Sequence, residues 1–317
     1  MALAAASGYP QYSGSLIPPM FSSKLVEQFY CSSTYADITT TEYSGELNKC
    51  GDQITFFRTP RVRVRRGQKD STIKHDTIDT CPITMVVDKE LEFSVKIAKV
   101  DVKQICNWDM WQTALLKSAS YNIGEAIDQE LLAKMYVEAD PTNKGLTAGV
   151  RTQLYNLGAV GAPVSMSSAN IWQVMTNVAA VLREQCLPMD DLFIVLPDVA
   201  LPHLLNAPLL MNNVGLSGAC CEVASNAILN GKIPQKIAGF DVYISHNVFS
   251  TVDGANVVYE VVAGWRGATA FAMQIEETRI IDNDKDSWDI YLQGMTVYGS
   301  KVIQPEGLAG VYAKFVP

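Results

Sequence analysis

An apolar repeat of threes and fours from Asp101 to Ala139 constrains the fold of this chain more than any other feature of its sequence. The spacing predicts one amphipathic helix. Asp101 and Gln104 resemble a capping box at its start, and Pro141 and Gly145 stop it. At about 1.5 Å per residue the helix runs roughly 55 Å, far beyond the eleven or twelve residues that are usual in globular proteins. Its apolar positions are Ile105, Trp108, Trp111, Leu115, Ala119, Ile123, Ile127, Leu131 and Met135.

Before this helix, the period changes to two between Asp52 and Ile97. Alternating apolar residues at both ends of this stretch, with a polar and turn-like passage from Gly67 to Thr80, predict a long antiparallel hairpin. Few residues in its middle can bury themselves against the same molecule. Because an isolated two-stranded ribbon is marginal in water, we expect it to lie on another surface.

The charges are segregated. The chain holds 25 Lys and Arg against 33 Asp and Glu, a net charge of −8, which disfavours general DNA binding. The stretch from Arg58 to Lys74 nevertheless carries seven basic residues and one acid. On a strand, alternate arginines share one face and the valines between them the other. This basic face could be merely solvated, bind DNA phosphates, or bind the acidic body of a neighbouring copy. We favour the neighbour, through Arg58, Arg61, Arg63, Arg65, Arg66 and Lys69.

The remaining segments predict an extended arm and an α+β second half. The first twenty residues lack a hydrophobic period, and Ser22 or Ser23 can cap a short helix to about Tyr30, with Leu25, Val26 and Phe29 on one side. Turns are expected at 231–234 and 252–254. A second amphipathic helix is expected from about Ser167 to before Pro188, and a short one over 199–205. Strands are expected over 192–196, 239–245, 257–262, 271–281 and 290–316.

A search for chemistry finds no catalytic, cofactor or metal pattern. The three histidines lie far apart, and the seven cysteines have no C-x-x-C pair and are interpreted as free thiols. Walker A and dinucleotide-binding motifs are missing. Asp282, Asp284 and Asp286 have the spacing of the first ligands of a calcium-binding loop, but the glycine and the final glutamate of that loop are missing. Both a cation site and a solvated hairpin turn remain as interpretations. No apolar run reaches the roughly eighteen residues of a membrane span. We therefore expect neither an enzyme nor a membrane protein.

Four short stretches carry a resemblance when they are taken in order and with their spacing. They are Ala126–Leu131, Ile237–Ser245, Phe271–Gln274, and Gly294–Val302 followed by Pro305. Together with the arm, the basic ribbon and the long helix, this chain resembles the major capsid protein of tailed double-stranded DNA phages, which has the α+β Hong Kong 97-like fold. The resemblance spans nearly the whole chain.

That resemblance implies a division of the chain and a set of partners. It implies an N-terminal arm at 1–35, an extended hairpin or E-loop with its attachment at 36–97, and a peripheral domain at 98–164 with the spine helix at 101–139. An axial domain at 165–264 and closing peripheral strands at 265–317 follow. Assembly into hexamers and pentamers is implied, with a portal, a separate scaffolding protein and packaged DNA that is not read by sequence. The shell would form in the host cytoplasm and end in the virion, and a decoration protein stays open.

Two alternatives remain. An encapsulin shares this fold and forms a cellular nanocompartment, but it would be expected to begin with an amphipathic cargo-binding helix, whereas residues 1–19 are extended and broken by proline. A soluble α+β enzyme is the alternative of a different class, and the missing acid, base and metal groups weigh against it.

Overall fold

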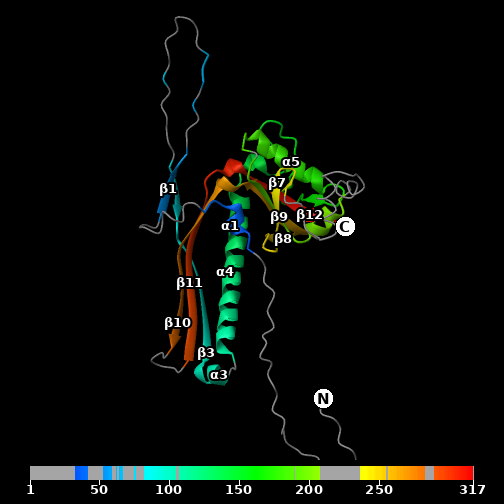
Figure 1. The fold of residues 1–317 in the computed structure, drawn as a ribbon. Coiled ribbons are helices and arrows are strands. Elements are labelled where there is room, and N and C mark those ends of the chain that lie inside the picture. The colour runs from blue at the N-terminus through cyan, green and yellow to red at the C-terminus, as the bar shows by residue number, and fades with distance from the viewer. Residues whose placement is uncertain are drawn as a thin grey trace, which may run out of the picture.

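The computed structural model describes most of the chain after the first 32 residues (Figure 1). The described residues are 33–41, 53–58, 62, 64–66, 75, 82–104, 107–188, 190–207, 236–254, 256–282 and 289–316. Within them lie a seven-stranded sheet, a three-stranded sheet and a two-stranded ribbon.

The seven-stranded sheet forms the larger body and has the order β4-β12-β9-β5-β7-β6, with β8 paired to β9. Its centre is β5, whose five apolar residues are all buried and alternate between two cores. On one face the apolar side of α5 covers the sheet, and on the other lies the second half of α4. The elements are β4 (Val164–Met166), α5 (Ile171–Glu184), β5 (Leu192–Leu196), α6 (Ala200–Leu205), β6 (Lys236–Ile237), β7 (Phe240–Ile244), β8 (Ser250–Asp253), β9 (Asn256–Trp265) and β12 (Leu308–Phe315).

A long, narrow arm of the molecule is built from the three-stranded sheet and α4. The sheet has the order β10-β11-β3, all antiparallel, from β10 (Thr269–Asp282), β11 (Asp289–Val302) and β3 (Lys89–Ala98). Beside it runs α4 (Trp108–Glu138), and α3 (Lys99–Gln104) follows β3 at the far end (Figure 1). Residues of β11 alternate between buried and partly exposed, as the period-two pattern of that stretch predicts.

Short elements join these parts. The helix α1 (Tyr35–Ile38) lies beside α4, and Thr40 continues it as a bridge to Ala270 of β10. In the described part of the chain, single turns of 3-10 helix connect longer elements at η1 (Pro141–Asn143), η3 (Arg266–Ala268) and η4 (Pro305–Gly307). The ribbon pairs β1 (Gln53–Phe57) with β2 (Pro82–Val86) in antiparallel register.

Most expectations for the second half are confirmed, and β5 has the predicted bounds to the residue. The predicted turn at 252–254 is wrong in part, because Val252 and Asp253 belong to β8, and of the three residues only Gly254 lies in the turn, with a φ of +63°. The predicted helix at 22–30 and the turn at 231–234 lie outside the described residues.

Two predictions for the first half are wrong. The expected single helix from Asp101 to Ala139 is two helices, α3 and α4, with Asn107 in a non-helical conformation before Trp108. The expected hairpin over 52–97 is also shorter, because β3 leaves it and pairs with β11, about two hundred residues later in the chain. Long-range pairing gives the apolar side of β3 a core, which a hairpin partner in open solvent could not provide. None of the described helices is long and apolar enough to cross a membrane.

Candidate inter-subunit surface

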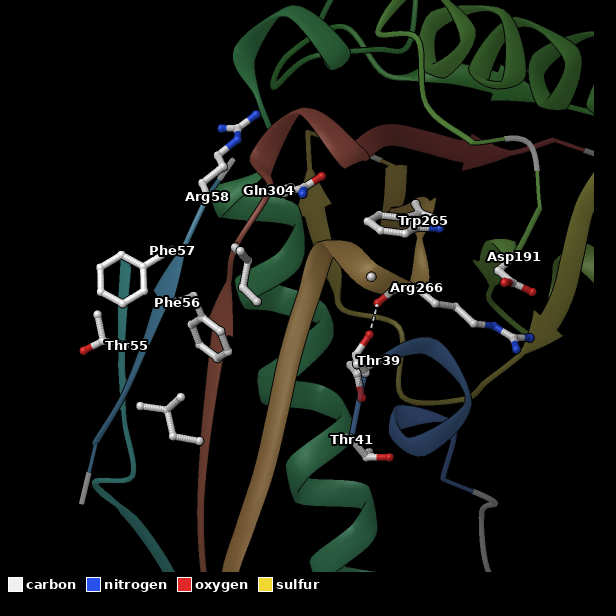
Figure 2. Close-up of a pocket in the computed structure, with 14 residues that line it drawn as sticks. Thr39, Thr41, Thr55, Phe56, Phe57, Arg58, Asp191, Trp265, Arg266 and Gln304 are labelled. Carbon is white, nitrogen blue, oxygen red and sulfur yellow. Dashed lines mark hydrogen bonds between the residues drawn. The ribbon is translucent and has the colours of Figure 1, made fainter. Parts of the chain in front are cut away.

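The base of the ribbon is fixed to the body through one face. Phe56 of β1 and Met85 of β2 are buried and contact Ala270 and Ala272 of β10. Strand alternation places the neighbouring Phe57 on the opposite side, where 72% of it is exposed. Figure 2 shows Phe56 turned toward the body and Phe57 turned away from it. The ribbon thus has one side with a core of its own and an opposite side on which Phe57 is exposed among polar residues.

Beyond β1, the described residues of the basic segment are exposed. Val62 is 72% and Val64 is 93% exposed, and Arg65 and Arg66 are exposed beside them. None of these four residues belongs to a strand, so the expected arginine ladder is wrong for the described part of the segment. An isolated ribbon with solvent on both faces has too little burial to hold a regular pairing.

The six predicted contact residues are therefore placed differently by the structure. Arg58 makes an ion pair within the chain, its Nη2 lying 3.0 Å from Glu306 Oε1 of η4. Both side chains are partly exposed, which limits the contribution of the pair to roughly 1 kcal/mol or less. Arg65 and Arg66 are exposed, and Arg61, Arg63 and Lys69 lie outside the described residues.

A polar cavity of about 960 Å³ separates the ribbon base from the junction of the two sheets (Figure 2). Its walls are β1, the residues after α1, and the turn around Arg266. Arg266 is held in place because its Nη2 donates to Asp241 Oδ2 at 3.0 Å and to Tyr243 Oη at 2.8 Å, while its carbonyl accepts from Thr40 Oγ1 at 3.2 Å. The cavity is a pre-formed recess beside the exposed ribbon.

One face of the three-stranded sheet carries carboxylates. Glu90 and Glu92 are exposed on β3, and Glu277 is exposed on β10. Met295 of β11 pairs with both Glu92 and Glu277, so these side chains form one row across the sheet. Glu90, two residues from Glu92 on β3, lies on the same face and pairs with Val297. We call Glu90, Glu92 and Glu277 together the acidic row, and it is opposite in charge to the ribbon.

A buried carboxylate that the sequence did not reveal joins the end of the N-terminal arm to α4. Asp128 is fully buried, and its two oxygens accept from Thr34 N and Tyr35 N, both at 2.7 Å, and from Asn247 Nδ2 at 3.1 Å. Burial raises the pKa of this carboxyl, although each of these hydrogen bonds opposes the shift. An acid on the apolar side of a helix, between Ile127 and Leu131, was the available signal.

The remaining candidates from the chemical search are not brought together. His203 stacks on Phe315 with ring centroids 5.7 Å apart, and the His246 ring lies 3.0 Å from Asp198 at the surface. Asp282 pairs with Lys99 at 2.7 Å, whereas Asp284 and Asp286 lie outside the described residues. In the described part of the chain no group of three acidic, histidine or cysteine side chains is placed to hold a metal ion.

Comparisons with known proteins give a match in structure only. No family model and no curated protein matches the sequence. A solved structure from Mycobacterium phage Che8 superposes with a TM-score of 0.70 at 18% identity, covering 96% of this chain and 98% of that one. The capsid of cyanophage P-SCSP1u superposes at 0.67 with 14% identity, covering 98% and 97%.

This chain has the phage capsid fold. The capsid of Ralstonia phage GP4 agrees, with a TM-score of 0.62 at 15% identity and a coverage of 98% of this chain and 99% of that one. The expected α+β class with a Hong Kong 97-like fold is thereby confirmed. Because the phage capsid fold extends over nearly the full length of both chains, the ribbon base, the narrow arm and the seven-stranded body belong to one architecture.

Proposed function

We propose that this protein is the major capsid protein of a tailed phage and assembles through hexamers and pentamers into an icosahedral shell around double-stranded DNA. The observation that carries the proposal is the full-length match to phage capsid structures at TM-scores up to 0.70. The role is structural rather than enzymatic. A closed shell joins many modest contacts per subunit, which together give stability that no single contact needs to supply.

The division of the chain follows from this proposal. Residues 1–35 act as the N-terminal arm and 36–97 as the E-loop with its attachment. The peripheral domain takes residues 98–164, with α4 as the spine, and 265–317, while residues 165–264 form the axial domain. Within residues 165–264, α5, β5 and β9 share one core, which supports an axial unit. The terminal strand β12 of the range 265–317 joins the same sheet and core.

The contact between subunits uses the basic segment and the acidic row. Exposed arginines beyond β1 bind Glu90, Glu92 and Glu277 of a neighbouring copy, while Phe57 and the valines of the segment bury their apolar surface on it. Support comes from the exposure of Val62 and Val64, which find no core in their own chain. Opposite charge on the two surfaces favours encounter in one register and disfavours others.

Other components complete the particle. A separate scaffolding protein and a portal take part in assembly, a decoration protein remains an option, and the DNA is enclosed without sequence recognition. Assembly takes place in the host cytoplasm, and the protein ends in the virion. The net charge of −8 supports a lining that does not immobilise the packaged DNA.

The test is the size of the assembled protein. Purified protein, alone and with the products of neighbouring genes, is examined by size-exclusion chromatography and negative-stain electron microscopy. Closed megadalton shells are expected, and DNA-filled particles from infected cells would separate a virion from a nanocompartment. A monomer or small oligomer under every condition, with turnover of a substrate, would point to the enzyme instead.

A further inference from the structure

The strand β3 lies at the edge of the three-stranded sheet. In the part of the chain that the structure describes, it pairs with β11 on one side and with no strand on the other. Every second residue of an edge strand directs its backbone N–H and C=O groups away from the neighbouring strand. The outer edge of β3 therefore offers a row of hydrogen-bonding groups, and such a row is a common site for the addition of a strand from another molecule.

The two faces of β3 differ in chemistry. Glu90 and Glu92 are exposed on one face, as part of the acidic row. Leu91, Phe93 and Val95 lie on the other face and are only partly buried, although Leu91 packs against a buried cluster beside α4. A strand added at this edge would place one set of its side chains beside the carboxylates and the other set beside the apolar residues.

A cleft of about 320 Å³ opens between β3 and α4, and we name it the edge cleft. Its polar lining residues are Glu92, Ser118 and Asn122, and the others are apolar. Leu115 and Ala119 of α4 belong to the wall opposite the apolar face of β3. Because protein interiors are close-packed, apolar side chains that meet across an open cleft favour an apolar occupant that fills it.

The basic segment has the alternation that this edge requires. Val62 and Val64 alternate with arginines in the sequence and are 72% and 93% exposed. Beside β3, these valines would enter the edge cleft while the arginines lie on the face of the acidic row. At about 3.3 Å per residue, residues 62–66 and residues 91–95 each span roughly 13 Å, so the two segments agree in length.

The position of the ribbon indicates that the occupant comes from another copy of the chain. β1 is antiparallel to β2, and β2 leads directly into β3, so β1 runs away from β3. At the end of β1, Arg58 is paired with Glu306 of η4. The segment that follows therefore starts on the side of the ribbon base that is remote from the edge cleft.

We propose that residues 62–66 of one copy add as a strand to the outer edge of β3 in a neighbouring copy, with Val62 and Val64 in the edge cleft. This inference rests on the proposed function and specifies how the contact between subunits is made. Backbone hydrogen bonds give the contact its direction, the valines give it apolar burial, and the charges select the face. The segment has no strand structure within one chain because its partner strand is on another molecule.

Disulfide trapping in assembled shells tests this contact. Two singly substituted chains are mixed before assembly, and the first carries Val64→Cys. The second carries one of three substitutions along the edge cleft, namely Leu115→Cys, Ala119→Cys or Ala126→Cys. At least one of these pairs is expected to cross-link, because a disulfide forms only where the two Cα atoms lie within about 7 Å. Lys117→Cys, exposed on the same helix and outside the cleft, and the wild-type chain are the controls and are expected to form no cross-link with Val64→Cys.

A side chain that fills the edge cleft gives an independent test. Ala119→Trp is expected to leave the circular dichroism of the unassembled chain unchanged and to lower the yield of shells about tenfold or more. That factor corresponds to the loss of one buried valine contact. Lys117→Trp adds the same side chain outside the cleft and is expected to assemble with the wild-type yield.

Each outcome separates the docking mode from the capsid function. Wild-type shells combined with none of the three cross-links would overturn the docking mode, and so would full assembly of Ala119→Trp, while the capsid function would stand. Cleft cysteines that couple to an added scaffolding protein instead of to Val64→Cys would assign the cleft to that protein and overturn the proposal. Failure of the wild type to form shells under any condition would overturn both the docking mode and the proposed function.

Discussion

Replacing Asp128 with alanine removes the acceptor of four donors from two distant parts of the chain. Thr34 N, Thr34 Oγ1 and Tyr35 N come from the end of the N-terminal arm, and Asn247 Nδ2 comes from the loop after β7. Thr34 and Asn247 are buried, and Asp128 accepts from Thr34 N and from Asn247 Nδ2. The substitution therefore leaves at least two buried donors without partners.

The expected loss follows from these donors and from the charge that goes with the carboxylate. A buried donor left without a partner costs about 1–3 kcal/mol, so two of them give about 2–6 kcal/mol. Removing a carboxylate whose pKa is raised by burial gives back part of this, because its charged form is disfavoured in the folded chain. We expect Asp128→Ala to lower the free energy of unfolding by about 2–3 kcal/mol, and Asp128→Asn, which keeps one acceptor, by less.

Urea denaturation of the unassembled protein, followed by circular dichroism, measures this change, and limited proteolysis near residues 33–41 shows whether the arm is released. Gln129→Ala, on the exposed side of the same turn of α4, is the matched control and is expected to stay within about 0.5 kcal/mol of the wild type. If Asp128→Ala is as stable as that control and its arm resists protease equally, the argument that Asp128 joins arm and body is refuted.

Three further results are expected. Burial raises the pKa of Asp128 above 3.8, so between these two pKa values the folded chain keeps a proton on this carboxyl that the unfolded chain has lost. The free energy of unfolding of the wild type therefore contains a component that falls as the pH rises from 3.8 through the raised pKa. Asp128→Asn lacks this component. Phe56→Ala lowers the stability of the monomer by about 3 kcal/mol or more in urea denaturation, whereas Phe57→Ala leaves that stability within about 0.5 kcal/mol and reduces the yield of shells in negative-stain microscopy. Replacing Arg61, Arg63, Arg65 and Arg66 together by Glu is expected to give a folded, soluble protein that forms no shells. Shells of native size at normal yield from this variant would exclude the basic segment from assembly. Adding Glu92→Lys to the same chain is expected to restore part of the yield.

The sequence predicts best those elements that are themselves buried on both faces. The run from Leu192 to Leu196 predicts β5 to the residue because a strand at the centre of a covered sheet is apolar throughout. The break before α4 escaped detection because Ile105, Trp108 and Trp111 keep the helical spacing across it. Asn107 followed by Asp109 is typical of a helix start and was the signal that the apolar pattern concealed.

Pairing over long distances could not be predicted from local pattern. The alternation in β3 indicates a strand but not its partner, which is β11 rather than β2. The same limit applies to the candidate surface. Sequence reasoning found the basic segment from its charge, but the acidic row depends on Glu92 and Glu277 being brought together by Met295, from three separate parts of the chain.

The positions of β11 and β12 have a consequence for synthesis on the ribosome. β11 is the middle strand of the three-stranded sheet, and β12 lies between β4 and β9 in the seven-stranded one. Neither sheet can close until residues 289–316 have emerged from the exit tunnel. A nascent polypeptide cut short before that point lacks an interior strand of each sheet, so a truncated chain cannot complete either layer.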